Sequence, residues 1–162
     1  MHVTTAIKSP DRGAMPEIRA LLTASDLPTD DLEDSTITLF GAFDDETLVG
    51  VVGLQSCEDV GLLRSLAVAP QHRDRGIARM LCAHVIAEAR ARGMASLWLL
   101  TTTAREYFTR HAFEAVAREE APEAIRATAQ FTSLCPSSAS VMRRWPCDEN
   151  MRASARSGDS AR

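Results

Sequence analysis

A basic turn that contains one glycine could bind a phosphate group. The turn runs from Arg73 to Ala78, and the amphipathic helix that it opens is expected to extend to Arg92. The N–H groups in the first turn of a helix lack partners within the helix, and the helix dipole adds positive potential there. Gly76 would let a ligand approach the backbone, and Arg73 and Arg75 add charge. The turn is therefore predicted to bind phosphate or pyrophosphate.

Two polar residues, Arg64 and Ser65, interrupt the apolar strand expected just before this turn. A buried arginine needs a partner, because an unpaired charge is costly away from water. One interpretation is a structural ion pair with an acidic neighbour such as Glu58, or exposure at a sheet face. The other is a substrate-binding role, in which Arg64 holds a carboxylate or another oxyanion with both ends of its guanidinium.

Spacing and composition predict the elements that must position these residues. Ile77, Met80, Leu81, His84 and Val85 recur at three and four residues and so share one helix face, where His84 is interpreted as a core histidine. Strands are expected at 3–8, 36–44, 48–55, 61–68, 96–101, 113–117 and 138–143, and helices at 10–26, 73–92, 104–111 and 122–131.

The order of these elements indicates how they connect. Three successive strands with short turns, from 36 to 68, predict an antiparallel meander. The strand, helix and strand that follow predict a parallel crossover. Gly50 and Gly53 within a strand indicate a bulge or a close neighbour.

Composition limits the class of protein. With 162 residues, 45% of them hydrophobic and 25% charged, residues 1–145 are predicted to form a single domain, and 146–162 a disordered tail. A net charge of -4 argues against a nucleic-acid binder. No apolar run approaches the ~18 residues of a membrane span, and no signal peptide is recognised. Four separated cysteines suggest reduced thiols in a cytoplasmic protein, without a metal site.

Three motifs in this order resemble the GCN5-related N-acetyltransferase (GNAT) superfamily. Its acetyl-CoA signature, Gln/Arg-x-x-Gly-x-Gly/Ala, matches 73–78 with Ala78 in the last place. Its upstream Leu-Ala-Val-x-Pro matches 66–70. Its downstream Ala-x-x-aromatic-aromatic-x-x-x-Gly-Phe matches 104–113, with Ala112 replacing the glycine. Three further segments, 62–68, 99–104 and 121–139, look similar to the acetyltransferases associated with arsenic-resistance operons.

The resemblance implies a fold and a cofactor. The fold would be α/β (α+β), with a mixed, mostly antiparallel sheet of six to seven strands that is splayed between strands 4 and 5 and flanked by helices. Acetyl-CoA would be the acyl donor, with no metal. Its pantetheine arm would pair with the backbone of Leu66, Ala67 and Val68. Its pyrophosphate would bind to Arg73, Asp74, Arg75, Gly76, Ile77, Ala78 and Arg79. A homodimer is conceivable, because dimers are common in the family.

The same resemblance leaves the catalytic groups open. Many family members place a tyrosine at the second aromatic position to protonate the departing thiolate, but this chain has Phe108 there. Tyr107 is the candidate acid, although one helical step turns a side chain by about 100°. Some relatives carry a glutamate that acts as the general base at the position of Leu62. Another group, a water relay or a neutral amine would have to replace it.

Further substrate contacts are expected near the end of the fifth strand. Thr101, Thr102 and Thr103 have either turn and capping duties or hydrogen bonds to the substrate. Cys135 falls in the segment that borders the acceptor site in the family fold. It is either an inert buried cysteine or an acceptor contact.

The leading hypothesis is an acetyl-CoA-dependent N-acetyltransferase for a small amine, in particular an anionic amino-acid-like compound linked to arsenic resistance. A non-catalytic acyl-CoA-binding sensor or scaffold is the first alternative, and a thiol-based sensor of arsenicals centred on Cys135 is the second.

Overall fold

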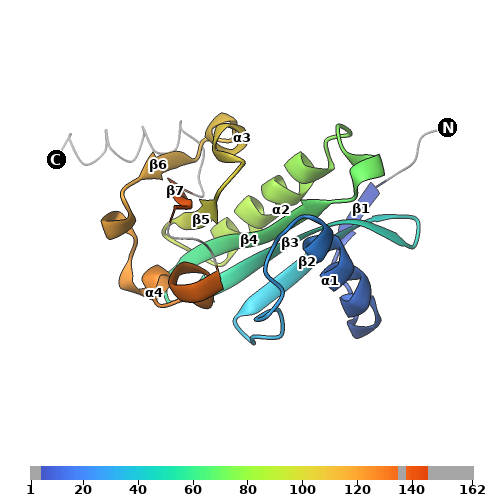
Figure 1. Ribbon diagram of the computed structural model, residues 1–162, viewed down its shortest axis with the longest axis horizontal. Helices are drawn as coiled ribbons and strands as arrows, with labels where there is room; N and C mark the ends of the chain where they lie inside the picture. The colour runs from blue at the N-terminus through green and yellow to red at the C-terminus, as the bar shows by residue number, and fades with distance from the viewer. Residues whose placement is uncertain (1–4, 135–137, 146–162) are drawn as a thin grey trace.

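One seven-stranded sheet forms the centre of the part of the chain that the structure describes. The structure is a computed structural model, and it describes residues 5–134 and 138–145. The strands lie in the order β1-β2-β3-β4-β5-β7-β6 (Figure 1). Their bounds are Thr5–Lys8 for β1, Ile37–Asp44 for β2, Thr47–Cys57 for β3, Val60–Val68 for β4, Leu97–Thr101 for β5, Glu114–Val116 for β6 and Ser140–Arg144 for β7.

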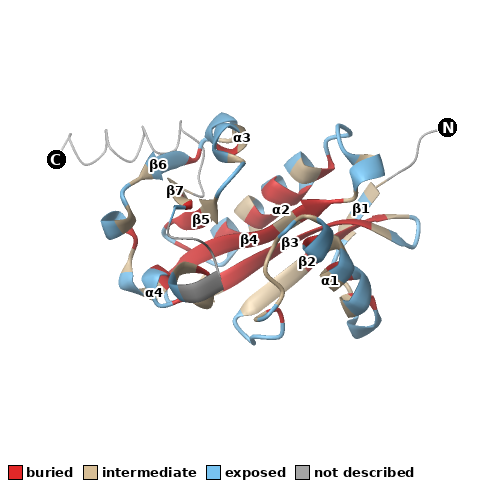
Figure 2. Cartoon of the chain, in the orientation of Figure 1, coloured by how far each residue is buried: buried red, intermediate tan, exposed pale blue. Residues whose placement is uncertain are grey.

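Two longer helices cover opposite faces of this sheet. They are α1, Met15–Ala24, and α2, Ile77–Ala91; α3, Arg105–Arg110, and α4, Glu123–Arg126, are shorter. Along β3, Val52 packs in one cluster with α2, whereas Val51 packs in another with α1. Successive side chains of a strand point to opposite faces, so both faces of β3 are covered. Figure 2 accordingly shows β3 and β4 buried over most of their length.

The sheet opens between β4 and β5. All other neighbouring strands pair antiparallel, but these two pair in parallel, and only at Gly61–Leu97 and Leu62–Trp98. Beyond these two pairs, β4 and β5 share no further residue pair in the part of the chain that the structure describes. The predicted meander, the parallel crossover and the splay between the fourth and fifth strands are confirmed.

The helix after the basic turn begins later than expected. Asp74 and Gly76 have positive φ angles, 64° and 78°, which a right-handed helix cannot include. Arg73 is extended, and α2 therefore starts at Ile77. The prediction of a helix from Arg73 was wrong by about one turn.

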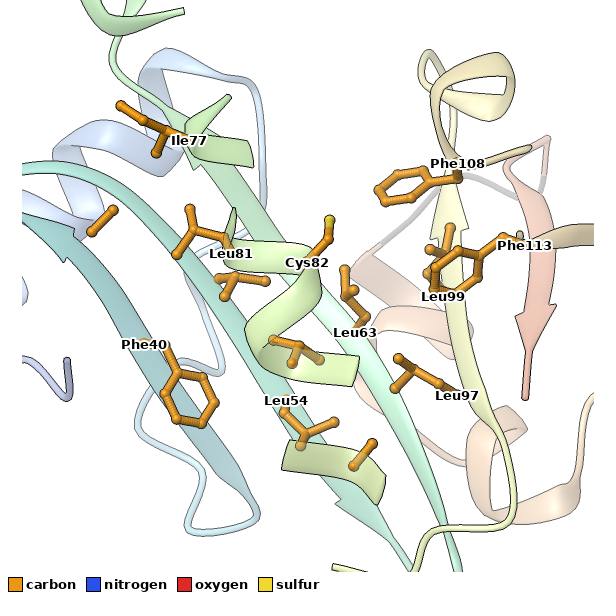
Figure 3. Packing of buried hydrophobic residues seen from close by; sticks show 14 of the residues in the cluster. Phe40, Leu54, Leu63, Ile77, Leu81, Cys82, Leu97, Leu99, Phe108 and Phe113 are labelled. Carbon is orange, nitrogen blue, oxygen red and sulfur yellow. The ribbon is translucent and has the colours of Figure 1, made fainter. Parts of the chain in front are cut away.

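The buried face of α2 also differs in one residue. Ile77, Leu81 and Val85 are buried as predicted, and Figure 3 shows Ile77 and Leu81 within the core, but Met80 is 40% exposed. Cys82 takes its place in the core. His84 is half-buried, with its ring centroid 4.6 Å from that of Phe40.

The expected helix over 122–131 is broken into two short pieces. The first, α4, has four residues, and a π-helical turn covers Gln130–Leu134. The hydroxyl of Thr128 donates to the carbonyl oxygen of Ile125 at 2.7 Å. Such a side-chain bond competes with the helical bonding pattern. The predicted tail, 146–162, lies outside the described residues, so the domain boundary stays a prediction. No helix in the described part of the chain is long and apolar enough to cross a membrane.

Replacing Leu81 by Ala is expected to lower the free energy of unfolding by about 2–5 kcal/mol, because a fully buried side chain would leave a cavity. Met80→Ala, one residue away but exposed, should change it by less than about 0.5 kcal/mol. Urea unfolding followed by circular dichroism measures both. Equal losses would contradict the assignment of the buried face.

Candidate active site

A β-bulge lies in β4 where that strand leaves β5. In the register with β3, Val51 pairs with Ala67 and Gly53 with Arg64, so two residues of β4 lie opposite one residue of β3. These two are Ser65 and Leu66, and Ser65 has a positive φ of 59°. A bulge leaves its extra residue outside the ladder, so backbone groups at this step are available to a ligand. Gly50 and Gly53 indicated a bulge or a close neighbour in β3, and β3 has both: Val49 is the extra residue in its pairing with β2, and a Cβ at Gly50 would lie 3.0 Å from Leu81.

The separated strands enclose a cavity of about 920 Å³. It joins the bulge to the basic turn and to α3. Among the predicted site residues, the lining includes Arg64, Ser65, Leu66, Ala67, Val68, Arg73, Asp74, Gly76, Ile77, Ala78, Arg79, Thr101 and Tyr107. Arg75 and Thr102 do not line it. Cys135 lies outside the described residues.

The basic turn presents a left-handed glycine and the start of a helix to the cavity. Gly76 is left-handed, and no atom lies within 4 Å of the place where a Cβ would be. Ile77, Ala78 and Arg79, at the start of α2, line the cavity, so N–H groups without partners in the helix lie beside it. The Nε of Arg73 donates to the carbonyl oxygen of Val68 at 3.3 Å, which holds this side chain at the end of β4.

The Arg64 side chain forms a buried ion pair. Its side chain is fully buried, and its two terminal nitrogens both donate to the carboxylate of Asp31. Nη1 also donates to Oε1 of Gln55 at 3.1 Å, and Nε to the hydroxyl of Ser65 at 3.3 Å. The ion-pair interpretation is confirmed, but the partner is Asp31 rather than Glu58. An acceptor carboxylate would meet an arginine whose charge is already balanced.

The three threonines at and after the end of β5 differ in their surroundings. The hydroxyl of Thr101 accepts a hydrogen bond from the backbone N–H of Ala104 at 3.0 Å, which is the expected turn duty. Thr101 and Thr103 line the cavity, whereas Thr102 is exposed away from it.

Tyr107 and Phe108 both reach the cavity from α3. Phe108 is buried and packs with Leu63, Leu99 and Phe113 (Figure 3). The hydroxyl of Tyr107 is buried near the thiol of Cys82 and makes no hydrogen bond of ordinary geometry. Burial, with Cys82 nearby, raises the pKa of Tyr107 to about 12. This phenol is therefore protonated at neutral pH.

Several lining residues were not predicted. His72 lines the cavity with its Nδ1 buried and unpaired, and its Nε2 is 3.8 Å from Oδ2 of Asp44. His111 packs its ring 4.5 Å from that of Tyr107. Burial first, and then the charges of Arg79, Arg110 and Arg144, lower the pKa of His111. The sequence held two signals for these residues. His111 lies four residues after Tyr107, a helical spacing, and His72 lies beside the basic turn.

One end of the cavity is made by a segment remote in sequence. Ser25, Leu27 and Pro28, which follow α1, line it together with Gln130. No sequence pattern linked them to the motifs. Within residues 5–134 and 138–145, no three His, Cys, Asp or Glu side chains are grouped to hold a metal ion.

A family model described as the acetyltransferase (GNAT) family matches residues 11–115. The chain belongs to this family. Membership confirms the predicted enzyme class, an acetyltransferase, and the cavity lies where the three motifs of the resemblance converge.

Relatives of the chain include a protein named as an amino-acid acetyltransferase. The chain is 36% identical over 84 residues to the amino-acid acetyltransferase of Neisseria meningitidis, a match that covers 51% of this chain and 19% of that protein. The chain thus spans about a fifth of that relative's length. Neither this relative nor the structures below are named for arsenic resistance.

Solved structures support the fold. N-acetylglutamate synthase from Neisseria gonorrhoeae, complexed with coenzyme A and N-acetyl-glutamate, superposes with a TM-score of 0.78 and 26% identity, over 91% of this chain and 36% of that one. A GNAT-family acetyltransferase from Staphylococcus aureus has a TM-score of 0.74 and 15% identity, over 89% of this chain and 100% of that one. The predicted GNAT fold is confirmed.

Tyr107 is the only tyrosine in the chain, so its ionisation can be followed directly. Absorbance at 295 nm should rise with a midpoint near pH 12 in the folded protein, against 10.0 for a free phenol. Between these values the folded state binds more protons than the unfolded state, so stability should fall as pH rises. A midpoint near 10 would contradict the burial of this hydroxyl.

Proposed function

We propose that the protein is an acetyl-CoA-dependent N-acetyltransferase that acetylates the amine of a small amino-acid-like compound carrying an extra anionic group. The observation that carries this proposal is the single cavity that connects an anion site at α2 with the bulge of β4. Family membership and relatives that acetylate amino acids support it. The link to arsenic resistance stays a prediction from the sequence.

The donor would lie along β4. The amides of Ile77, Ala78 and Arg79 would bind the pyrophosphate of acetyl-CoA. The pantetheine arm would pair with the backbone of Leu66, Ala67 and Val68, as an added strand does at an open edge. The thioester would then lie at the bulge, whose free backbone groups can polarise its carbonyl.

The reaction needs a neutral amine that attacks the thioester carbon. A tetrahedral intermediate forms, the C–S bond breaks, and the thiolate of CoA takes up a proton. We assign that proton to Tyr107, which lines the cavity and is protonated at neutral pH. Leu62 is fully buried and apolar, so the strand offers no base at that position. Removal of the amine's proton is assigned to solvent.

The acceptor would occupy the end of the cavity beyond the bulge. Ser25, Thr101 and Thr103 offer hydroxyl groups there, and Gln130 an amide. Contacts from Ser65 and Thr102 remain proposals. Arg64 would reach an acceptor carboxylate only by exchange with Asp31, because both its terminal nitrogens are in use. Acceptor contact by Cys135 also remains a proposal.

Charge reversal at Arg79 tests the donor site. Isothermal titration with acetyl-CoA should give a dissociation constant for Arg79→Glu at least about tenfold higher than for the wild type, because an opposing charge worth ~1.4 kcal/mol replaces a favourable one. Arg105→Glu makes the same change on α3, at a side chain outside this cavity, and should bind normally. Unaltered binding by Arg79→Glu would count against the donor site.

Removal of one hydroxyl tests the acid. With acetyl-CoA and glutamate, or another acidic amino acid, thiol release should show kcat of Tyr107→Phe reduced by roughly 10²-fold, with little change in KM. A normal kcat would mean that water protonates the thiolate. Binding of acetyl-CoA by the wild type without transfer to any amine of a broad panel would instead favour a non-catalytic CoA-binding module.

A further inference from the structure

A chain of hydrogen bonds joins the segment after α1 to the bulge of β4. Asp31 accepts from Arg64 through both carboxylate oxygens, and Nε of Arg64 donates to the hydroxyl of Ser65 in the bulge at 3.3 Å. On the other side, Nη1 of Arg64 donates to Gln55 at 3.1 Å, and Nε2 of Gln55 to the hydroxyl of Thr36 at 3.2 Å. The chain thus begins at Asp31 and ends at Thr36, and Arg64 in its middle also binds Ser65 of the bulge.

Burial makes this connection hard to break. The Arg64 side chain is fully buried, and that of Asp31 is 14% exposed. Separating the two would leave a guanidinium with no counter-ion in the interior, which is strongly destabilising. Arg64 lies beside the bulge, so moving the segment that contains Asp31 away would leave the Arg64 guanidinium unpaired in the interior.

Apolar packing places the same segment against the sheet. Leu32, next to Asp31, is buried among Val51 and Ala67 of the sheet and Ile18 of α1. Leu27, three residues after the end of α1, donates its N–H to the carbonyl oxygen of Leu22 at 2.9 Å. The acceptor-side wall of the cavity, Ser25 to Pro28, is therefore anchored at both of its ends.

We infer that Asp31 and Arg64 are a positioning pair that couples the acceptor-side wall, 25–28, to the bulge at Ser65–Leu66. The inference rests on the proposed function, since it assigns the acceptor to one side of this pair and the thioester to the other. The bulge requires Ser65 in a left-handed conformation that a serine rarely adopts. Arg64 holds the Ser65 hydroxyl directly, and Asp31 fixes Arg64. The amine and the thioester are thereby held by one connected unit.

Asp31→Asn tests this coupling. Loss of the charge should lower kcat and raise KM for the acceptor, for a combined loss of roughly 10²-fold, which is the scale of a 1 Å misplacement. The dissociation constant of acetyl-CoA should change by less than about twofold, because its phosphates are proposed to bind at the start of α2 and not at the bulge. Asp30→Asn removes the neighbouring, exposed carboxylate and should leave all three constants unchanged.

A double variant separates positioning from the cost of a buried charge. Asp31→Leu with Arg64→Met removes both charges and should restore the melting temperature toward the wild-type value, since apolar pairs can replace buried ion pairs. Activity should stay low, because the bond to Ser65 is lost. Recovery of kcat together with stability would overturn the inference, as would a loss of acetyl-CoA affinity equal to the loss of kcat.

Hydrogen–deuterium exchange supplies a readout that needs no activity. In Asp31→Asn, amides of both 25–36 and 63–68 should exchange faster than in the wild type or Asp30→Asn. Asp31→Glu, which keeps the charge, provides a milder variant if Asp31→Asn unfolds, and should show the same paired increase at a smaller size. Faster exchange in 25–36 alone would overturn the coupling. Absence of acetyl transfer by the wild type would defeat the proposed function and leave this measurement decisive.

Discussion

The separation of β4 from β5 is the constraint on which the site depends. These strands share only two parallel residue pairs, after which side chains rather than hydrogen bonds fill the space between them. Leu63, Leu99 and Phe108 pack together in this gap (Figure 3). Phe108 belongs to α3, and its ring lies between the two strands, so this helix helps to keep them apart. The cavity exists because the sheet cannot close over this packing.

The burial of Phe108 affects which residue can serve as the proposed catalytic acid. At the second aromatic position, Phe108 is buried in the core, where a hydroxyl would need a partner. The polar aromatic residue of the pair is instead Tyr107, one helical step away, whose side chain lines the cavity while its hydroxyl is buried near Cys82. The ring of Tyr107 packs edge-on against that of Phe108, with centroids 5.3 Å apart. Packing and the proposed acid function are thus divided between neighbouring residues.

Local patterns in the sequence were sufficient for the strands and for the place of Gly76 before the helix, while phosphate binding there stays a prediction. The meander followed from apolar runs with short turns, and Gly76 from its place in a basic turn. The start of α2 was missed because two left-handed residues, Asp74 and Gly76, extend the turn, and backbone φ is not written in a hydrophobic period. The exposure of Met80 was missed because the buried face of α2 runs through Ile77, Leu81, Cys82, Val85 and Ala89, and spacing alone did not exclude the position three residues after Ile77.

Features that depend on distant contacts could not be predicted in the same way. A buried Arg64 implied some acidic partner, and Glu58 was near in sequence, but Asp31 lies 33 residues away and reaches it only through the fold. The wall formed by Ser25 to Pro28 has no motif of its own for the same reason. Secondary-structure patterns report local bonding, whereas these contacts are decided by how α1 packs across β3 and β4.

The balance of charge in the cavity bears on the acceptor. At the donor end, Arg73 and Arg79 line the cavity, and among the described residues no carboxylate forms an ion pair with either. Their positive potential suits phosphates. At the bulge, the charge of Arg64 is matched by Asp31, so that end is polar but nearly neutral. An acidic acceptor would therefore be held by hydroxyl and amide groups, or by displacing Asp31. Because the second route would break the pair that orders the bulge, the first is the arrangement that keeps the proposed thioester site intact.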